Sequence, residues 1–157
     1  MRSLSIAATL VVAALTAAGL AAAQTSPQTP APAAAAPART PSPAGAEVYI
    51  ISPKDGATVY NPVLVQFGLK GMGIAPAGIK FDNTGHHHLL IDSAPPSDMS
   101  LPLPATDKIV HFGKGQTETT VTLAPGKHTL QLLFADQNHI PHQPPVISSR
   151  ITVTVVR

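Results

Sequence analysis

The sequence of 157 residues contains no cysteine and no tryptophan, and only 11% of its residues are charged. Without cysteine, the chain has neither disulfides nor thiolate metal sites nor thiol redox chemistry. A folded domain must therefore be stabilised by packing alone. Any bound metal ion must be held by histidine, carboxylate or methionine side chains.

The chain also lacks a basic cluster, although its formal net charge is +2. Two of its ten basic residues, Arg2 and Arg39, precede residue 46, so region 46–157 has eight basic and eight acidic residues. Nucleic-acid and anionic membrane partners require a patch or stripe of positive charge. We therefore expect no nucleic-acid partner and, in the mature form, no membrane. The sequence does not identify a protein partner.

The amino terminus has the pattern of a secretory signal peptide. Arg2 supplies a positive charge, the run from Leu4 to Ala23 is apolar, and its last residues are the small ones that signal peptidase accepts. About twenty apolar residues could also remain as a membrane anchor. Alanine-rich composition and the absence of a following Lys/Arg cluster argue against an anchor. We predict a cleaved signal peptide over residues 1–23 and release into the periplasm or the medium.

Two further segments follow the predicted signal peptide. Residues 24–45 are rich in Pro, Ala, Ser and Thr, and they have no large side chains whose burial could offset the conformational entropy lost on folding. We expect them to form a disordered linker. Residues 46–157 have the length of one domain with a core of its own.

Short β-strands separated by turn residues fill region 46–157, and no stretch of ten or more residues has the apolar period of a helix. The residues Ala124 to Lys127 contain a Pro-Gly pair and predict a hairpin turn. The expected extended segments are 47–52, 58–69, 86–92, 109–112, 117–123, 128–136 and 146–156. This pattern predicts an all-β, immunoglobulin-like sandwich of about seven strands.

Four separated motifs carry a resemblance to a known family. They are Gly85 to Asp92 (GHHHLLID), His111 to Glu118 (HFGKGQTE), Pro125 to Leu132 (PGKHTLQL) and the stretch from Asp136 to Ser149. Their order resembles a family of secreted bacterial domains of unknown function, numbered 4399, over nearly all of the predicted domain. The resemblance implies no established activity.

A looser similarity concerns the segment from Ser52 to Val59, SPKDGATV. It is similar to the opening strand and turn of periplasmic copper-carrier domains with a sandwich fold. Those carriers place a ligand histidine at the mature amino terminus, where this chain has its proline-rich segment.

The seven histidines all lie between His86 and His142. Alternation along a strand places His86 and His88 on one face and His87 on the other, so the pair can offer two imidazoles to one ion. Copper and zinc both accept imidazole ligands. The candidate metal ligands are His86, His88, His111, His139 and His142.

Other residues have weaker roles in this hypothesis. Asp136 could bind the ion or orient an imidazole, and Met99 is a soft ligand suited to reduced copper. His87 is expected to point inward and to bond a backbone carbonyl, and His128 is expected to be structural. Protons compete with metal for imidazole, so we expect affinity to fall from about pH 7.5 to pH 5.5, around the unperturbed pKa of about 6.5.

Enzyme signatures are missing from the sequence. No serine lies in a Gly-x-Ser-x-Gly elbow, the carboxylates are scattered singly, and Gly113 to Gly115 lack the full spacing of a phosphate loop. Two hypotheses remain. The first is an exported, non-enzymatic domain that binds copper or zinc through histidines. The second is a metal-free envelope or adhesion-type interaction domain whose histidines are structural.

Overall fold

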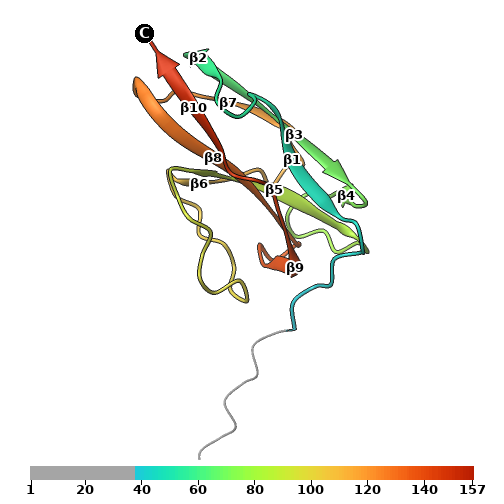
Figure 1. Cartoon of the computed structure of the whole chain (residues 1–157). Helices are drawn as coiled ribbons and strands as arrows, with labels where there is room; N and C mark the ends of the chain where they lie inside the picture. The colour runs from blue at the N-terminus through green and yellow to red at the C-terminus, as the bar shows by residue number, and fades with distance from the viewer. Residues whose placement is uncertain (1–37) are drawn as a thin grey trace, which may run out of the picture. The chain divides into compact units, whose positions relative to one another are not determined.

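The computed structural model describes residues 38–157, which form ten β-strands and no helix (Figure 1). No helix capable of crossing a membrane is therefore found in this range. The strands are β1 (Glu47–Ser52), β2 (Thr58–Tyr60), β3 (Val63–Lys70), β4 (Gly73–Ile74), β5 (Thr84–Ile91), β6 (Ile109–His111), β7 (Glu118–Val121), β8 (Gly126–Ala135), β9 (Pro141–Ile147) and β10 (Ile151–Val156).

The strands form two sheets. One has the order β1-β3-β7, and the other has the order β2-β10-β8-β5-β4, with β6 added to β5 and β9 added to β8. The pairs β2–β10 and β4–β5 are parallel, and the other pairs are antiparallel. The long strands β5 and β8 therefore form the centre of the larger sheet (Figure 1).

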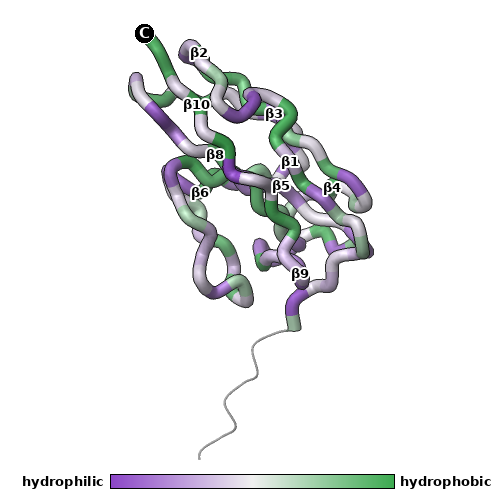
Figure 2. Tube along the Cα trace, in the orientation of Figure 1, coloured by the Kyte–Doolittle hydropathy of each residue, from purple (hydrophilic) through white to green (hydrophobic). Residues whose placement is uncertain are grey.

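A shared core joins the two sheets face to face. Val65 and Phe67 of β3 contribute side chains from the small sheet, and Leu89, Leu132 and Phe134 contribute from the large one; all five are at most 4% exposed. The predicted all-β sandwich is confirmed, with ten strands in place of about seven. Figure 2 shows hydrophobic segments of β5 and β8 in the middle of the fold.

Strand β5 is covered on both faces. Its residues Leu89 and Ile91 face the core between the sheets, whereas Leu90 packs in a second cluster with Leu133 and with Leu103 of the loop after β5. Through Leu103, the loop over residues 92–108 covers part of the outer face of the large sheet. Seven of the eight residues of β5 are buried as a result, including three histidines.

One expected segment and one expected hairpin are divided between the two sheets. The expected extended unit 58–69 is two strands, because the chain leaves β2 in the large sheet at Asn61-Pro62 and enters β3 in the small one. The predicted hairpin through Ala124 to Lys127 is wrong. Strand β7 pairs with β3, and both edges of β8 are occupied by β5 and β10, so this turn connects the two sheets.

Proline obscured one strand that the structure contains. Strand β9 includes Pro141, Pro144 and Pro145, and it takes the first two residues of the segment expected over 146–156. Proline donates no backbone hydrogen bond, so strands that contain it lie at sheet edges or bulges. Strand β9 fits this rule, since it is an addition to β8 and its pairing is irregular between Phe134 and Ala135.

The packed part of the chain begins before Ala46. Backbone hydrogen bonds join Thr40 and Ser42 to Gln143 of β9, within the region expected to be linker. The predicted signal peptide and the linker prediction for residues 24–37 lie outside the described residues.

Candidate metal centre

Four histidines converge on the outer face of the large sheet. His86 and His88 alternate on β5, and His111, at the end of β6, is the direct cross-strand partner of His88. His139 comes from the loop between β8 and β9. Strand alternation places the first pair, as predicted, and the β5–β6 register adds the third ring.

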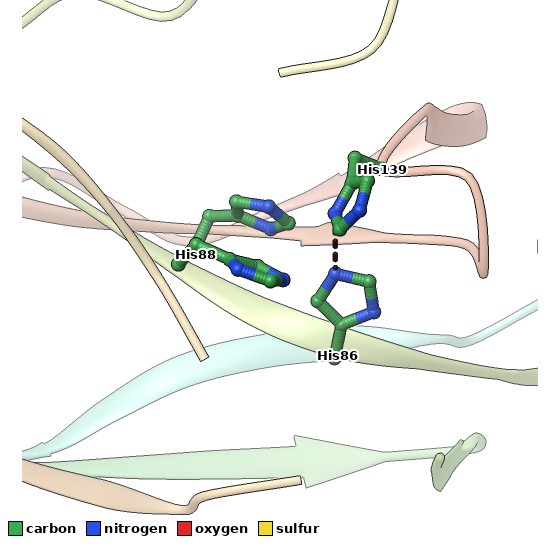
Figure 3. Close-up of side chains that lie close together, drawn as sticks. His86, His88 and His139 are labelled. Carbon is green, nitrogen blue, oxygen red and sulfur yellow. Dashed lines mark hydrogen bonds between the residues drawn. The ribbon is translucent and has the colours of Figure 1, made fainter. Parts of the chain in front are cut away.

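The four rings are close enough to share one ion. Their centroids lie 4.5 to 6.0 Å apart in all six pairs, and one nitrogen from each lies within 4.8 Å of the others. Nε2 of His86 is 3.1 Å from Nδ1 of His139, the contact drawn as a dashed line in Figure 3. Nitrogens bound to a tetrahedral zinc ion are about 3.3 Å apart, from metal–nitrogen distances of 2.0 to 2.1 Å. The His86–His139 pair already has about this spacing, and the other ligand nitrogens, at up to 4.8 Å, would move closer around an ion.

Several ring nitrogens of the cluster have no hydrogen-bond partner although they are buried. They are Nδ1 of His86, both nitrogens of His88 and Nε2 of His111. An unsatisfied buried polar atom costs about 1 to 3 kcal/mol, so native proteins rarely keep several together without a reason. A metal ion that accepts nitrogen lone pairs would satisfy one atom on each ring.

Burial keeps His86, His88 and His111 neutral, which is the form of imidazole that binds metal. Burial, followed by repulsion from His111 and His139, lowers the pKa of His86 to about 4. Burial, and then His86 and His111, lowers the pKa of His88 to about 3. The pKa of His111 is also lowered, first by burial and then by His139. These histidines therefore present lone pairs at neutral pH.

A short loop closed by Asp136 presents His139. Oδ1 of Asp136 accepts hydrogen bonds from the backbone N–H groups of Asn138 and Ile140, at 2.9 and 3.0 Å. The N–H of His139 donates to the carbonyl of Asp136 at 2.9 Å, and His139 has a φ of 65°. Non-glycine residues rarely adopt this left-handed conformation, and where they do it often serves a function. Asp136 thus orients a histidine through its backbone, and it is not one of the grouped ligands.

The cluster is reached from the side of His111 and His139. These two residues are partly exposed, whereas His86 and His88 are at most 1% exposed. Gly113 leaves room for the ring of His111, because a Cβ at this position would overlap Cε1 and Nε2 of that ring. Sequence reasoning missed this role and considered Gly113 as part of an incomplete phosphate loop. Its position two residues after a candidate ligand was the available signal.

A surface cavity of about 240 Å³ lies elsewhere. Thr40, Lys80, Phe81 and Gln137 are among its lining residues, and none of the four clustered histidines is.

The structure does not bring His142 into the cluster. Its ring stacks on Phe134, with centroids 5.9 Å apart, and Phe134 belongs to the core between the sheets. His142 lies three residues after His139 and already belongs to β9, which leads away from the loop that carries His139. Met99 packs against the second hydrophobic cluster with Leu103.

The other two histidines have structural partners. His87 faces the core between Phe67 and Phe134, and its Nδ1 lies 3.3 Å from the carbonyl of Gln116, as predicted. His128 forms an ion pair with Asp92 at 2.7 Å. Neither lies in the cluster.

Comparisons with known proteins identify a family but no characterised relative. No curated protein and no solved structure matched the chain. The similarity to copper carriers is therefore not shown. Residues 65–156 match the family described as domain of unknown function DUF4399, and this match includes all four clustered histidines. It covers more than half of the sequence, so the chain belongs to the DUF4399 family.

Proposed function

We propose that this protein is an exported, non-enzymatic domain that binds one zinc or copper ion through His86, His88, His111 and His139. The observation that carries the proposal is the convergence of four histidine rings, three of which have buried nitrogens without a hydrogen-bond partner. Export rests on the signal-peptide pattern of residues 1–23.

The donor set narrows the choice of metal. Four neutral imidazoles suit zinc and copper, whereas magnesium and calcium require oxygen ligands. No cysteine is present, and no carboxylate belongs to the group. The carboxylate of Asp136 acts electrostatically on His86. It therefore favours the binding of a positively charged ion beside that ring.

The number of ligands favours binding over catalysis. Catalytic zinc sites have three protein ligands and an open position for water, whereas structural sites are closed by four. Here the fourth ligand, His139, already lies 3.1 Å from His86. We therefore assign the site to holding or carrying an ion.

Calorimetric titration of the mature protein with Zn²⁺, Cu²⁺ and, under reducing conditions, Cu⁺ tests the proposal. We expect one ion per chain, with the preferred metal identified by the tightest binding. His86→Ala should abolish tight binding, and the matched variant His128→Asn, outside the cluster, should bind as the parent does. Absence of binding for all three ions would favour the metal-free interaction domain instead.

A further inference from the structure

His139 is the one ligand of the four that does not come from a strand. Two backbone hydrogen bonds hold it, one from its N–H to the carbonyl of Asp136 and one from the N–H of Leu103 to its own carbonyl, at 2.9 and 2.8 Å. The position of its ring therefore depends on the loop 136–140. This loop is ordered by the buried carboxylate of Asp136.

The second oxygen of that carboxylate is bound by a residue far away in the sequence. Oγ1 of Thr40 donates to Oδ2 of Asp136 at 2.6 Å, across 96 positions of the chain. Asp136 is only 3% exposed, and the threonine hydroxyl gives its second oxygen a hydrogen-bond partner. Thr40 thereby completes the hydrogen bonding of the group that shapes the His139 loop.

Thr40 belongs to a short strap, residues 39–42, that lies along β9. The N–H of Gln143 donates to the carbonyl of Thr40 at 2.9 Å, and the N–H of Ser42 donates to the carbonyl of Gln143 at 3.0 Å. Nε of Arg39 donates to the carbonyl of Pro141 at 2.9 Å. Figure 1 shows the chain entering the fold beside β9. The strap is thus held without a bond to any of the four clustered histidines, and it lies next to the loop that carries one of them.

We infer that the strap is a positioning element for the metal site, and that Thr40 acts on His139 through Asp136. The inference rests on the proposed function. A ligand on a loop must be ordered before it binds, and prior ordering raises affinity by reducing that cost. Coupling of this kind is reciprocal, so a bound ion also stabilises the docked strap. The strap precedes the family match, which begins at residue 65.

Zinc titration of Thr40→Val, which keeps the shape and removes the hydroxyl, tests the inference. We expect an affinity loss of about tenfold, in the range found for groups that support metal ligands. Thr40→Ser should retain the affinity of the parent protein. Ser42→Ala is the matched control, because it removes a strap hydroxyl that bonds the carbonyl of Pro144 and not Asp136.

A double-mutant cycle with His139→Ala distinguishes positioning from a general loss of structure. In the His139→Ala background, Thr40→Val should cause no further loss of affinity. Bound zinc should also slow hydrogen exchange at the N–H groups of Ser42 and Gln143 in the parent protein.

Each of the other outcomes overturns the inference. Parent-like affinity of Thr40→Val would do so, as would an equal loss in both backgrounds or a Thr40→Val protein that does not fold by circular dichroism. A parent protein that binds no zinc or copper would overturn the proposed function together with the inference. If the parent protein binds metal and Thr40→Val binds it with the same affinity, the inference is overturned while the proposed function stands.

Discussion

His88 and His111 stand directly opposite each other on β5 and β6, with ring centroids 5.1 Å apart. Backbone pairing therefore fixes two ligands of the candidate site before any loop is placed. Both ring nitrogens of His88 are buried without a hydrogen-bond partner. A ligand histidine would offer one of them to the ion, so the two functional hypotheses assign different roles to His88.

Replacing His88 with leucine should abolish metal binding and leave the metal-free protein as stable as before, or more stable. Leucine fills a similar volume next to Leu90 and Leu133 and removes two unsatisfied polar atoms. Calorimetry would measure the binding, and urea unfolding without metal would measure the free energy of unfolding. A decrease of more than about 2 kcal/mol in the free energy of unfolding would instead indicate a structural histidine.

Gly113→Ala should weaken metal binding at least about tenfold, because the added Cβ would occupy the space of the His111 ring. The φ of Gly113 is not positive, so alanine causes no backbone strain there. Gly73→Ala on β4 is the matched control, since its Cβ would meet only Thr84 Cγ2, at 3.3 Å. Equal zinc affinities for both variants would show that His111 does not bind the ion in this position.

Sequence patterns could predict the strand-borne part of the site. The His-x-His alternation places His86 and His88 on one face, and it sends His87 into the core. The choice between His139 and His142 could not be predicted. It depends on the left-handed backbone of His139 and on the Asp136 hydrogen bonds, which bring distant groups together.

The fold shows the same division. Strand β1 was visible as a short segment of β-branched and aromatic residues, because local composition determines it. The assignment of β7 to the small sheet could not be predicted, because it depends on the non-local strands β5 and β10 that occupy both edges of β8. Thr40 gave no local signal at all, because its role exists only through contact with Asp136.

Protonation of His86 and His88 should contribute little to the pH dependence of metal affinity between pH 7.5 and 5.5, less than the unperturbed histidine pKa leads one to expect. Two histidines with a pKa of about 6.5 would together lose about 100-fold in affinity by pH 5.5. The pKa of His86 is about 4 and that of His88 about 3, so both remain neutral over this interval in the folded protein. Titrations at pH 7.5, 6.5 and 5.5 would check this, and a 100-fold decrease would contradict it.

The metal-free fold should lose stability over the same interval. Burial is the main cause that lowers the pKa of His86 and His87 to about 4 and of His88 to about 3. The unfolded chain takes up protons below about 6.5, whereas the folded chain does not until the lower values. The contribution of these histidines to the free energy of unfolding is therefore fully present above pH 6.5, and it is lost as the pH falls toward 3 to 4.

By pH 5.5, each of these three histidines should lower the free energy of unfolding of the metal-free protein by on the order of 1 kcal/mol. Urea unfolding of the metal-free protein at pH 7.5 and 5.5 measures the total, and His88→Leu should show a smaller difference than the parent. Equal stability at both pH values would mean that the rings are not buried as described.

His128 should respond to pH in the opposite direction. Its Nδ1 lies 2.7 Å from Oδ2 of Asp92 and its Nε2 lies 2.8 Å from the carbonyl of Ala124. Both partners are acceptors, so the protonated ring, in which both nitrogens donate, fits this position best. The hydrogen bond to Asp92 raises the pKa of His128. This stabilisation is present below the unfolded pKa of about 6.5 and is lost as the pH rises through the higher folded value.

Asp92→Asn removes the charge and changes little else. Asparagine tolerates the positive φ of 50° at this position, and its amide oxygen can still accept the N–H of Thr129. We expect the pKa of His128 to fall toward 6.5 in an NMR titration of its ring. The loss of unfolding free energy should be larger at pH 6 than at pH 9, because the parent pair is ionised only at the lower pH. A parent His128 that titrates at or below 6.5, or an equal loss at both pH values, would show that no imidazolium is present.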